Sequence, residues 1–125
     1  MTTNHRNFRK LEVWHDAIEL AAVVYRVTAT FPASEIYGLT AQLRRASVSI
    51  SSNIAEGYGR STRGEYLNQL SAAAGSLNEV ESVTAVCLRL DIGDRSGLDE
   101  LNSKLTILQK RLVRLRMRLR KTKGV

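Results

Sequence analysis

Six leucines near the C-terminus repeat at alternating steps of four and three residues. They are Leu101, Leu105, Leu108, Leu112, Leu115 and Leu119. On a helix of ~3.6 residues per turn, this spacing places all six side chains along one narrow stripe. In water such a stripe is stable only when other helices cover it. The repeat therefore predicts a long helix that packs inside a helical bundle.

Helix-ending signals in the rest of the chain predict three further helices. We expect the first over residues 13–30, because a residue before Pro32 is steered away from helical geometry. The second covers residues 33–56, allows a break near Gly38 and stops at the glycines of residues 57–59. Its apolar stripe is expected on the inner face of the bundle and consists of Leu39, Leu43, Ala46, Ile50 and Ile54.

The third helix is expected to open at the capping box formed by Thr62 and Glu65. Residues 91–95 make the next turn, and residues 96–99 cap the fourth helix, with acids in its first turn. The expected inner face of the first helix is Trp14, Ile18, Ala21, Tyr25 and Thr28. Four helices with short connections predict an all-α, antiparallel up-down-up-down four-helix bundle. The chain is expected to form a single domain over residues 1–125, with residues 1–10 as a flexible tail.

Charge is distributed very unevenly along the chain. Residues 101–125 hold nine basic residues and no acid, whereas residues 1–100 are slightly acidic, and the whole chain carries +7. Arginine donates two hydrogen bonds to one phosphate, so this stretch predicts binding to the backbone of RNA or DNA. The candidate nucleic-acid-binding residues are Lys110, Arg111, Arg114, Arg116, Arg118, Arg120 and Lys121. No zinc-finger spacing, stacking platform or Gly-rich RNA-binding loop indicates readout of bases.

A second interpretation of the basic stretch remains open. In an up-down bundle the first helix starts beside the end of the fourth, and it carries the acidic stripe Glu12, Asp16 and Glu19. Those three acids could pair with three of the basic residues and leave the others unmatched. The alternative function is then a pure protein–protein assembly module with no nucleic-acid role.

A polar stripe lies beside the apolar stripe of the second helix. It consists of Arg45, Ser49, Asn53 and Glu56. Polar groups beside an apolar seam are best known as devices that specify one packing partner. We therefore expect these four residues to fix assembly between helices or subunits, with Arg45 and Glu56 as a candidate ion pair; a ligand-binding role is the less favoured alternative.

The residues that could support catalysis or bind a metal are few and scattered. His5 lies in the polar N-terminus, His15 has only one Glu at three-residue spacing, and Cys87 lies in an apolar run. Neither a nucleophile–base pair nor a bundle metal site can be built from them. The sequence predicts a protein that is not an enzyme and uses no cofactor. The single cysteine, the absence of a signal-peptide pattern and the lack of a long apolar run favour the cytoplasm and no membrane association.

One ordered motif resembles a known family. Residues 31–57 read FP..E.YGL..Q.RRA..SI..N.AEG, and they follow the pattern set by Phe8, Leu11, Val13, Trp14 and Ala17. This combination is similar to the bacterial four-helix-bundle family of 23S rRNA intervening-sequence proteins, which includes accessory proteins of diversity-generating retroelements. The resemblance implies a cytosolic bundle that assembles into a homopentamer. For the retroelement branch it also implies nucleic acid and a reverse transcriptase as partners.

Overall fold

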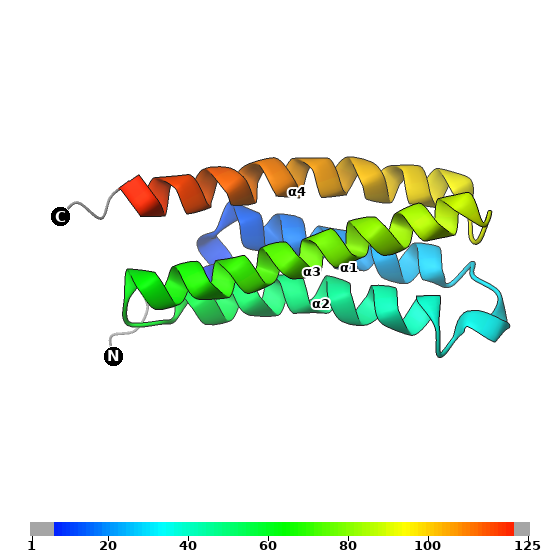
Figure 1. Cartoon of the computed structure of the whole chain (residues 1–125), viewed down its shortest axis with the longest axis horizontal. Helices are drawn as coiled ribbons and strands as arrows, with labels where there is room; N and C mark the ends of the chain where they lie inside the picture. Colours follow the sequence, from blue (N-terminus) through cyan, green and yellow to red (C-terminus); the bar gives the residue numbers. More distant parts are fainter. Residues whose placement is uncertain (1–6, 122–125) are drawn as a thin grey trace.

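The computed structural model describes residues 7–121. Within that range the chain forms four α-helices and two 3-10 turns, with no strand (Figure 1). The α-helices are α1 (Glu12–Thr28), α2 (Leu39–Tyr58), α3 (Arg63–Arg89) and α4 (Arg95–Lys121), and the turns are η2 (Phe8–Lys10) and η3 (Ala33–Glu35). Residues 1–6 of the expected flexible tail lie outside the described residues. No helix among the described residues combines the length and the apolar character needed to cross a membrane.

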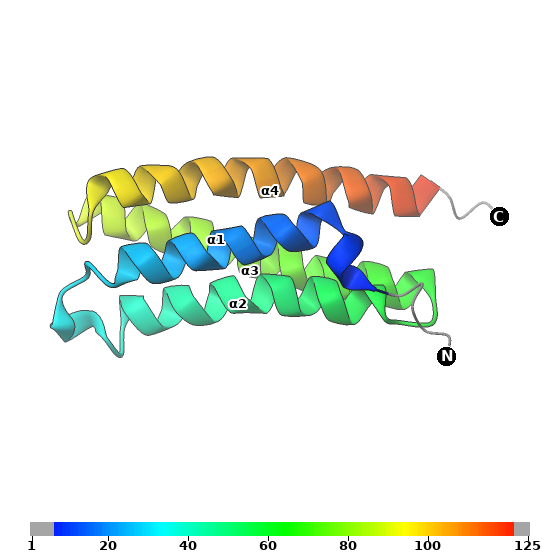
Figure 2. The same ribbon diagram turned by 180° about the vertical axis from the view of Figure 1, so that it is seen from behind.

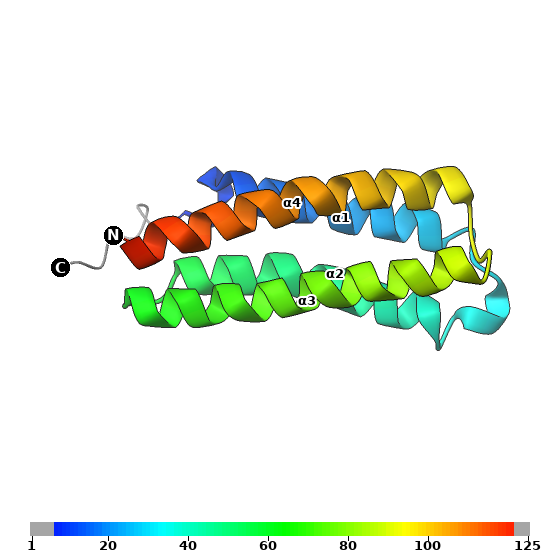
Figure 3. The same cartoon turned by 45° about the horizontal axis from the view of Figure 1, so that its top comes forward.

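The four helices lie side by side along the long axis of the molecule (Figure 1 and Figure 2). The connections α1–α2 and α3–α4 lie at one end, and the connection α2–α3 lies at the other. Figure 3 shows α4 alongside α1 and α3, with its C-terminal end where α3 begins. This arrangement brings the basic end of α4 next to the first turns of α1.

The leucine stripe of α4 forms one wall of the core, as the heptad predicts. Its first four leucines are buried, namely Leu101, Leu105, Leu108 and Leu112. The last two, Leu115 and Leu119, are half-buried toward the C-terminal end of α4. The predicted stripe of α2 is also confirmed, since all of it except the half-buried Leu39 is buried. The two walls meet the buried apolar residues of α1 and α3, so the four helices share one core.

The predicted inner face of α1 is wrong. Ile18 and Tyr25 are 40% and 45% exposed, and of the five predicted residues only Thr28 is buried. The buried residues of α1 are instead Val13, Ala17, Leu20, Val23, Val24, Val27 and Thr28. This helix carries apolar side chains around most of its circumference, so its periodicity allows two faces. Packing against both α2 and α4 selects the valine-rich face.

Several predicted helix boundaries also need correction. The cap of α4 is Asp94, whose side chain accepts a hydrogen bond from the backbone N–H of Gly97 at 3.2 Å. As a result α4 begins at Arg95, and its first turn holds no acid. The predicted stop at residues 57–59 is confirmed, because α2 ends at Tyr58 and Gly59 is its cap. Gly57 itself is buried inside the helix, and a Cβ there would lie 2.7 Å from Cβ of Gln69. Its lack of a side chain lets α2 approach α3 closely. The expected break near Gly38 is present, because α2 begins only at Leu39.

Candidate nucleic-acid interface on the C-terminal helix

The second half of α4 separates leucines from charges across the helix. Its inner side carries the end of the leucine stripe, while most of its Lys and Arg residues point away from the core. Leucine, arginine and lysine are strong helix formers, and basic residues in the last turn interact favourably with the negative end of the helix dipole. A regular helix therefore holds these charges at fixed spacing.

Arg111 is paired with two acids of α1. Its guanidinium donates two hydrogen bonds to the carboxylate of Asp16, at 2.7 and 2.8 Å, and it lies 3.7 Å from Glu12. The hydrogen bond that Asp16 accepts and the charges of both acids raise the pKa of Arg111. Both hydrogen bonds come from the same nitrogen, Nη1, and the opposite charges of the two groups make the contact stronger than one between neutral groups. Arg111 therefore holds α4 against α1 and has little capacity left for a phosphate.

This pairing uses fewer basic residues than the predicted match of three acids with three basic residues. One arginine takes both Glu12 and Asp16, because its planar fork presents several donors at once. Glu19 forms no ion pair with any residue in the described range 7–121. More basic residues of α4 thus remain unmatched than residue counting suggests.

Arg116 points to a different neighbour. It donates a hydrogen bond to the hydroxyl of Ser71 on α3 at 3.2 Å, and its Nε is buried without a hydrogen-bond partner among the described residues. A buried donor of this kind costs free energy unless a partner satisfies it. Arg116 therefore lies at the α3–α4 contact and contributes less than its neighbours to the outer surface.

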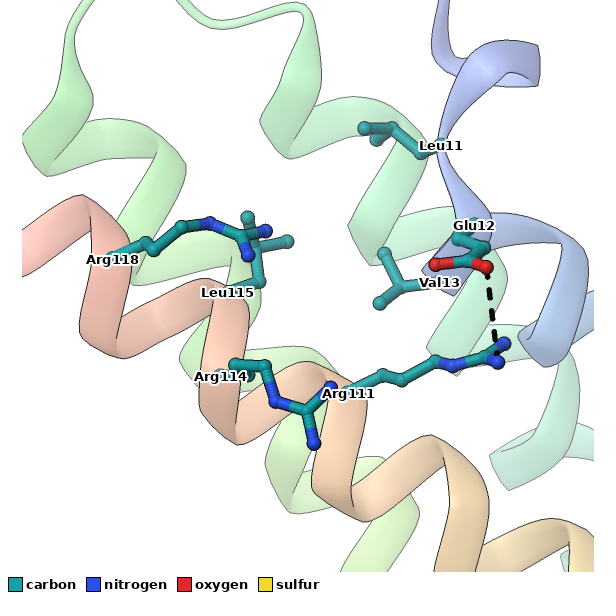
Figure 4. A pocket seen from close by; sticks show the side chains of 7 residues that line it. All are labelled: Leu11, Glu12, Val13, Arg111, Arg114, Leu115 and Arg118. Atoms are coloured by element: carbon teal, nitrogen blue, oxygen red, sulfur yellow. Dashed lines mark ion pairs between the residues drawn. The ribbon is translucent and has the colours of Figure 1, made fainter.

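Arg114 and Arg118 flank a small cavity between α4 and the start of α1 (Figure 4). The cavity has a volume of about 90 Å³, and Leu11, Val13 and Leu115 form its apolar lining together with Glu12 and Arg111. Figure 4 shows Glu12 engaged with Arg111, while Arg114 and Arg118 extend from the α4 side. Two guanidinium groups one helical turn apart repel each other, so an anion between them would be stabilising.

Besides Arg116, which bonds only the hydroxyl of Ser71, five basic residues in this half of α4 form no ion pair with an acid of residues 7–121. We call them the basic face; they are Lys110, Arg114, Arg118, Arg120 and Lys121. All five are exposed, so they can reach a ligand in solution. The structure thus brings five of the seven predicted nucleic-acid-binding residues onto the surface of α4 and directs Arg111 and Arg116 toward neighbouring helices.

The polar stripe of α2 forms a hydrogen-bond network with α3. Ser49 bonds the hydroxyl of Ser76 at 2.8 Å, and Asn53 donates to the carbonyl and the hydroxyl of Ser49 at 2.8 and 3.0 Å. Gln69 donates to the side-chain oxygen of Asn53 at 2.7 Å and to Glu56 at 3.5 Å. Three of the four predicted assembly residues therefore meet α3 of their own chain. Gln69, which joins them, was not identified from the sequence.

Arg45 lies apart from this network. It is exposed and forms no ion pair with Glu56 or with any other acid in the described range. The two residues are about 16 Å apart along α2 at ~1.5 Å per residue, which is too far for an ion pair. Its neighbour Arg44 is used instead: it donates to the hydroxyl of Thr28 at 2.8 Å and lies 4.5 Å above the ring of Tyr25.

Of the residues considered for catalysis, those that the structure describes lie apart, and each is already in contact with its own surroundings. The ring of His15 lies 2.6 Å from the backbone carbonyl of Arg9, and Cys87 is buried in the core, where burial raises the pKa of its thiol. Residues 7–121 contain no group of three or more His, Cys, Asp or Glu side chains that could hold a metal ion. His5 lies outside the described residues.

Comparison with known proteins identifies a family and solved structures with a similar fold. The family model described as 23S rRNA-intervening sequence protein matches residues 9–114. Among solved structures, the chain is similar to a protein with unknown function from the S23 ribosomal protein family of Bacteroides thetaiotaomicron VPI-5482. The two are 23% identical, with a TM-score of 0.73, over 82% of this chain and 96% of that chain, and this likeness shows a shared fold. No curated protein matches the chain.

Proposed function

The chain belongs to the family of 23S rRNA-intervening sequence proteins, and from this premise we propose that it is a small, non-catalytic scaffold that binds structured RNA or DNA. The basic face of α4 supplies the contacts to the phosphate backbone. The observation that carries this proposal is that its five residues have no acidic partner among the described residues. When unpaired cations bind a nucleic acid, the nucleic acid releases counterions from its phosphates, and this release favours binding.

The proposal includes an assembly in the cytoplasm. Each subunit is an antiparallel up-down-up-down bundle, supported by the alternating ends of the helix connections (Figure 1). Subunits associate into a homo-oligomer, a pentamer by resemblance, and this association multiplies the number of basic faces on one particle. A protein partner such as a reverse transcriptase belongs to the proposal only for the retroelement branch of the resemblance.

The polar stripe of α2 serves assembly in two ways under this proposal. Ser49, Asn53 and Glu56 hold α2 against α3, while the exposed Arg45 contacts a neighbouring subunit. Arg45→Ala should then leave the unfolding transition almost unchanged and lower the sedimentation coefficient of the oligomer. The matched control is Arg26→Ala, which removes an exposed arginine from α1 instead of α2. An unchanged sedimentation profile for Arg45→Ala removes Arg45 from the interface.

Fluorescence anisotropy with a labelled RNA hairpin and a labelled DNA duplex tests the binding function. We expect Arg114→Gln/Arg118→Gln to weaken binding of both probes about tenfold, because two phosphate contacts are lost. The control Arg26→Gln/Arg89→Gln removes the same charge from exposed positions on α1 and α3 and should change affinity about twofold or less. Equal losses for the two variants, or no binding by the wild type, would favour the pure protein–protein assembly module.

A further inference from the structure

Apolar side chains interrupt the charges on the outward side of α4. Val113 and Met117 are 51% and 49% exposed, and Ile107 is 45% exposed farther toward the N-terminus of the helix. Val113 and Met117 are four residues apart, so they lie on one side of the helix. With Gln109, Lys110 and Arg114 they line a shallow hollow of about 500 Å³. The outer surface of α4 is therefore both basic and apolar.

Neither the bundle nor a phosphate backbone accounts for these apolar residues. The bundle packs on the leucine stripe, whose buried residues lie on the opposite side of α4. Phosphates need only the lysines and arginines. A ligand that covers Val113 and Met117 removes their apolar surface from water, and this burial favours binding by roughly 25 cal/mol per Å². An apolar pair within a hollow marks an interaction site more specifically than a single exposed residue does.

We infer that this surface docks an amphipathic helix with acidic flanks from another protein. The apolar stripe of such a helix covers Val113 and Met117, as helices do in hydrophobic grooves. Its carboxylates pair with Lys110 and Arg114, for which residues 101–125 supply no acid. The flexible side chain of Met117 adapts to differently shaped apolar residues. The inference goes beyond the proposed function, because it assigns a protein partner to the outer surface of α4.

A membrane surface is less well matched to this side of the helix. Helices that lie in the lipid interface insert a broad side rich in Trp, Phe and Leu. Here the leucines face the core, and no aromatic residue occurs between residues 101 and 125. The patch of one valine and one methionine is small, which suits a single apolar ridge of a protein partner.

The test uses two fluorescein-labelled synthetic peptides of identical composition, made only of Leu, Ala and Glu. One places leucines at steps of three and four, and the other scrambles them so that no stripe forms. We expect the amphipathic peptide to bind the full chain about tenfold more tightly than the scrambled one, since only it buries apolar surface. Val113→Ser/Met117→Ser should abolish this preference and leave anisotropy with the RNA hairpin unchanged.

Val86→Ser/Leu90→Ser is the matched control, because it removes an exposed apolar pair from the last turn and the cap of α3 and should leave the preference intact. Hydrogen exchange of the wild type with and without the peptide gives a second readout, with protection expected around residues 107–117. Equal affinity for both peptides would overturn the inference, because it would show that the surface binds peptides through charge alone. Two other results, seen without a peptide preference, would also overturn the inference. One is binding to anionic vesicles that is lost in Val113→Ser/Met117→Ser, and the other is self-association that is lost in the same variant.

Discussion

A network of polar side chains between α2 and α3 is hydrogen-bonded internally, whereas the basic face of α4 has no acidic partner among residues 7–121. In the first region Gln69 donates to Asn53, which donates to Ser49, so these three side chains satisfy one another. In the second region Arg114 and Arg118 flank a cavity in which Glu12 is already engaged with Arg111. The first region completes the fold of the chain, and the second is arranged for a ligand.

The close contact of α2 with α3 gives the largest expected effect on stability. Gly57→Ala should lower the free energy of unfolding by about 1–3 kcal/mol, because the new Cβ would meet Cβ of Gln69 at 2.7 Å. Gly75→Ala is the control: a Cβ placed there would meet no atom within 4 Å beyond the adjacent backbone of its own helix, so it should stabilise α3 by about 0.5–1 kcal/mol. Urea denaturation measures both. Similar values for the two variants would mean that the contact is not close.

The hydrogen-bond network gives the next effect. Asn53→Ala should lower the free energy of unfolding by about 1 kcal/mol, because Gln69 loses the acceptor that it reaches at 2.7 Å. In a double-mutant cycle with Gln69→Ala, the two losses should be less than additive by about 0.5–1 kcal/mol. Additive losses, measured by urea denaturation, would show that the network does not couple α2 to α3.

Tyr66 supplies a pH-dependent contribution at the same contact. Burial, with a smaller contribution from Tyr58, raises its pKa from 10.0 to about 12. Between these two values the unfolded chain loses the phenolic proton while the folded chain keeps it, so stability falls as the pH rises. Tyr66→Phe should lose less stability than the wild type over this range in thermal melts. At neutral pH the change should be small, because the buried hydroxyl has no hydrogen-bond partner among residues 7–121.

The Asp16–Arg111 pair should give the smallest change in folding and an informative change in binding. Asp16→Asn removes the negative charge and one of the two oxygens that accept from Arg111 at 2.7 and 2.8 Å, so Arg111 becomes available to a phosphate. The protein should become slightly less stable, while its salt dependence of RNA binding steepens by up to about 0.9 in log–log slope. Glu19→Gln, which neutralises an acid with no ion pair in the described range, is the control. An unchanged slope for Asp16→Asn would place Arg111 outside the binding surface.

The sequence predicts the all-α fold well where one side of a helix is clearly apolar. The leucine heptad and the stripe of α2 are confirmed because each has a single apolar face. The prediction for α1 is wrong because its apolar residues surround the helix, and only packing against two neighbours selects between Ile18 and Val24. The cap at Asp94 was missed because Ser96 is also a good capping residue, and the choice depends on the turn geometry.

The candidate site was predicted in location and only partly in detail. Charge counting identifies the end of α4 as basic, but it does not show that Arg111 takes two acids or that Arg116 turns to Ser71. Those outcomes depend on the reach and angle of side chains from two helices. The role of Gln69 was missed for the same reason, because its partner Asn53 becomes a neighbour only when α2 and α3 pack. Residues such as Arg45, exposed in the single chain, keep their assembly role as a prediction.

The most direct measurement of the central claim is the affinity of the full chain for a labelled RNA hairpin across a salt series. If the basic face binds the phosphate backbone, log affinity should fall linearly with log salt, with a slope of roughly −0.7 to −0.9 for each phosphate engaged and several phosphates in total. Arg114→Gln/Arg118→Gln should make this slope shallower by about two phosphates. Weak binding, or affinity that does not change with salt, would contradict the claim that the basic face is a polyanion site.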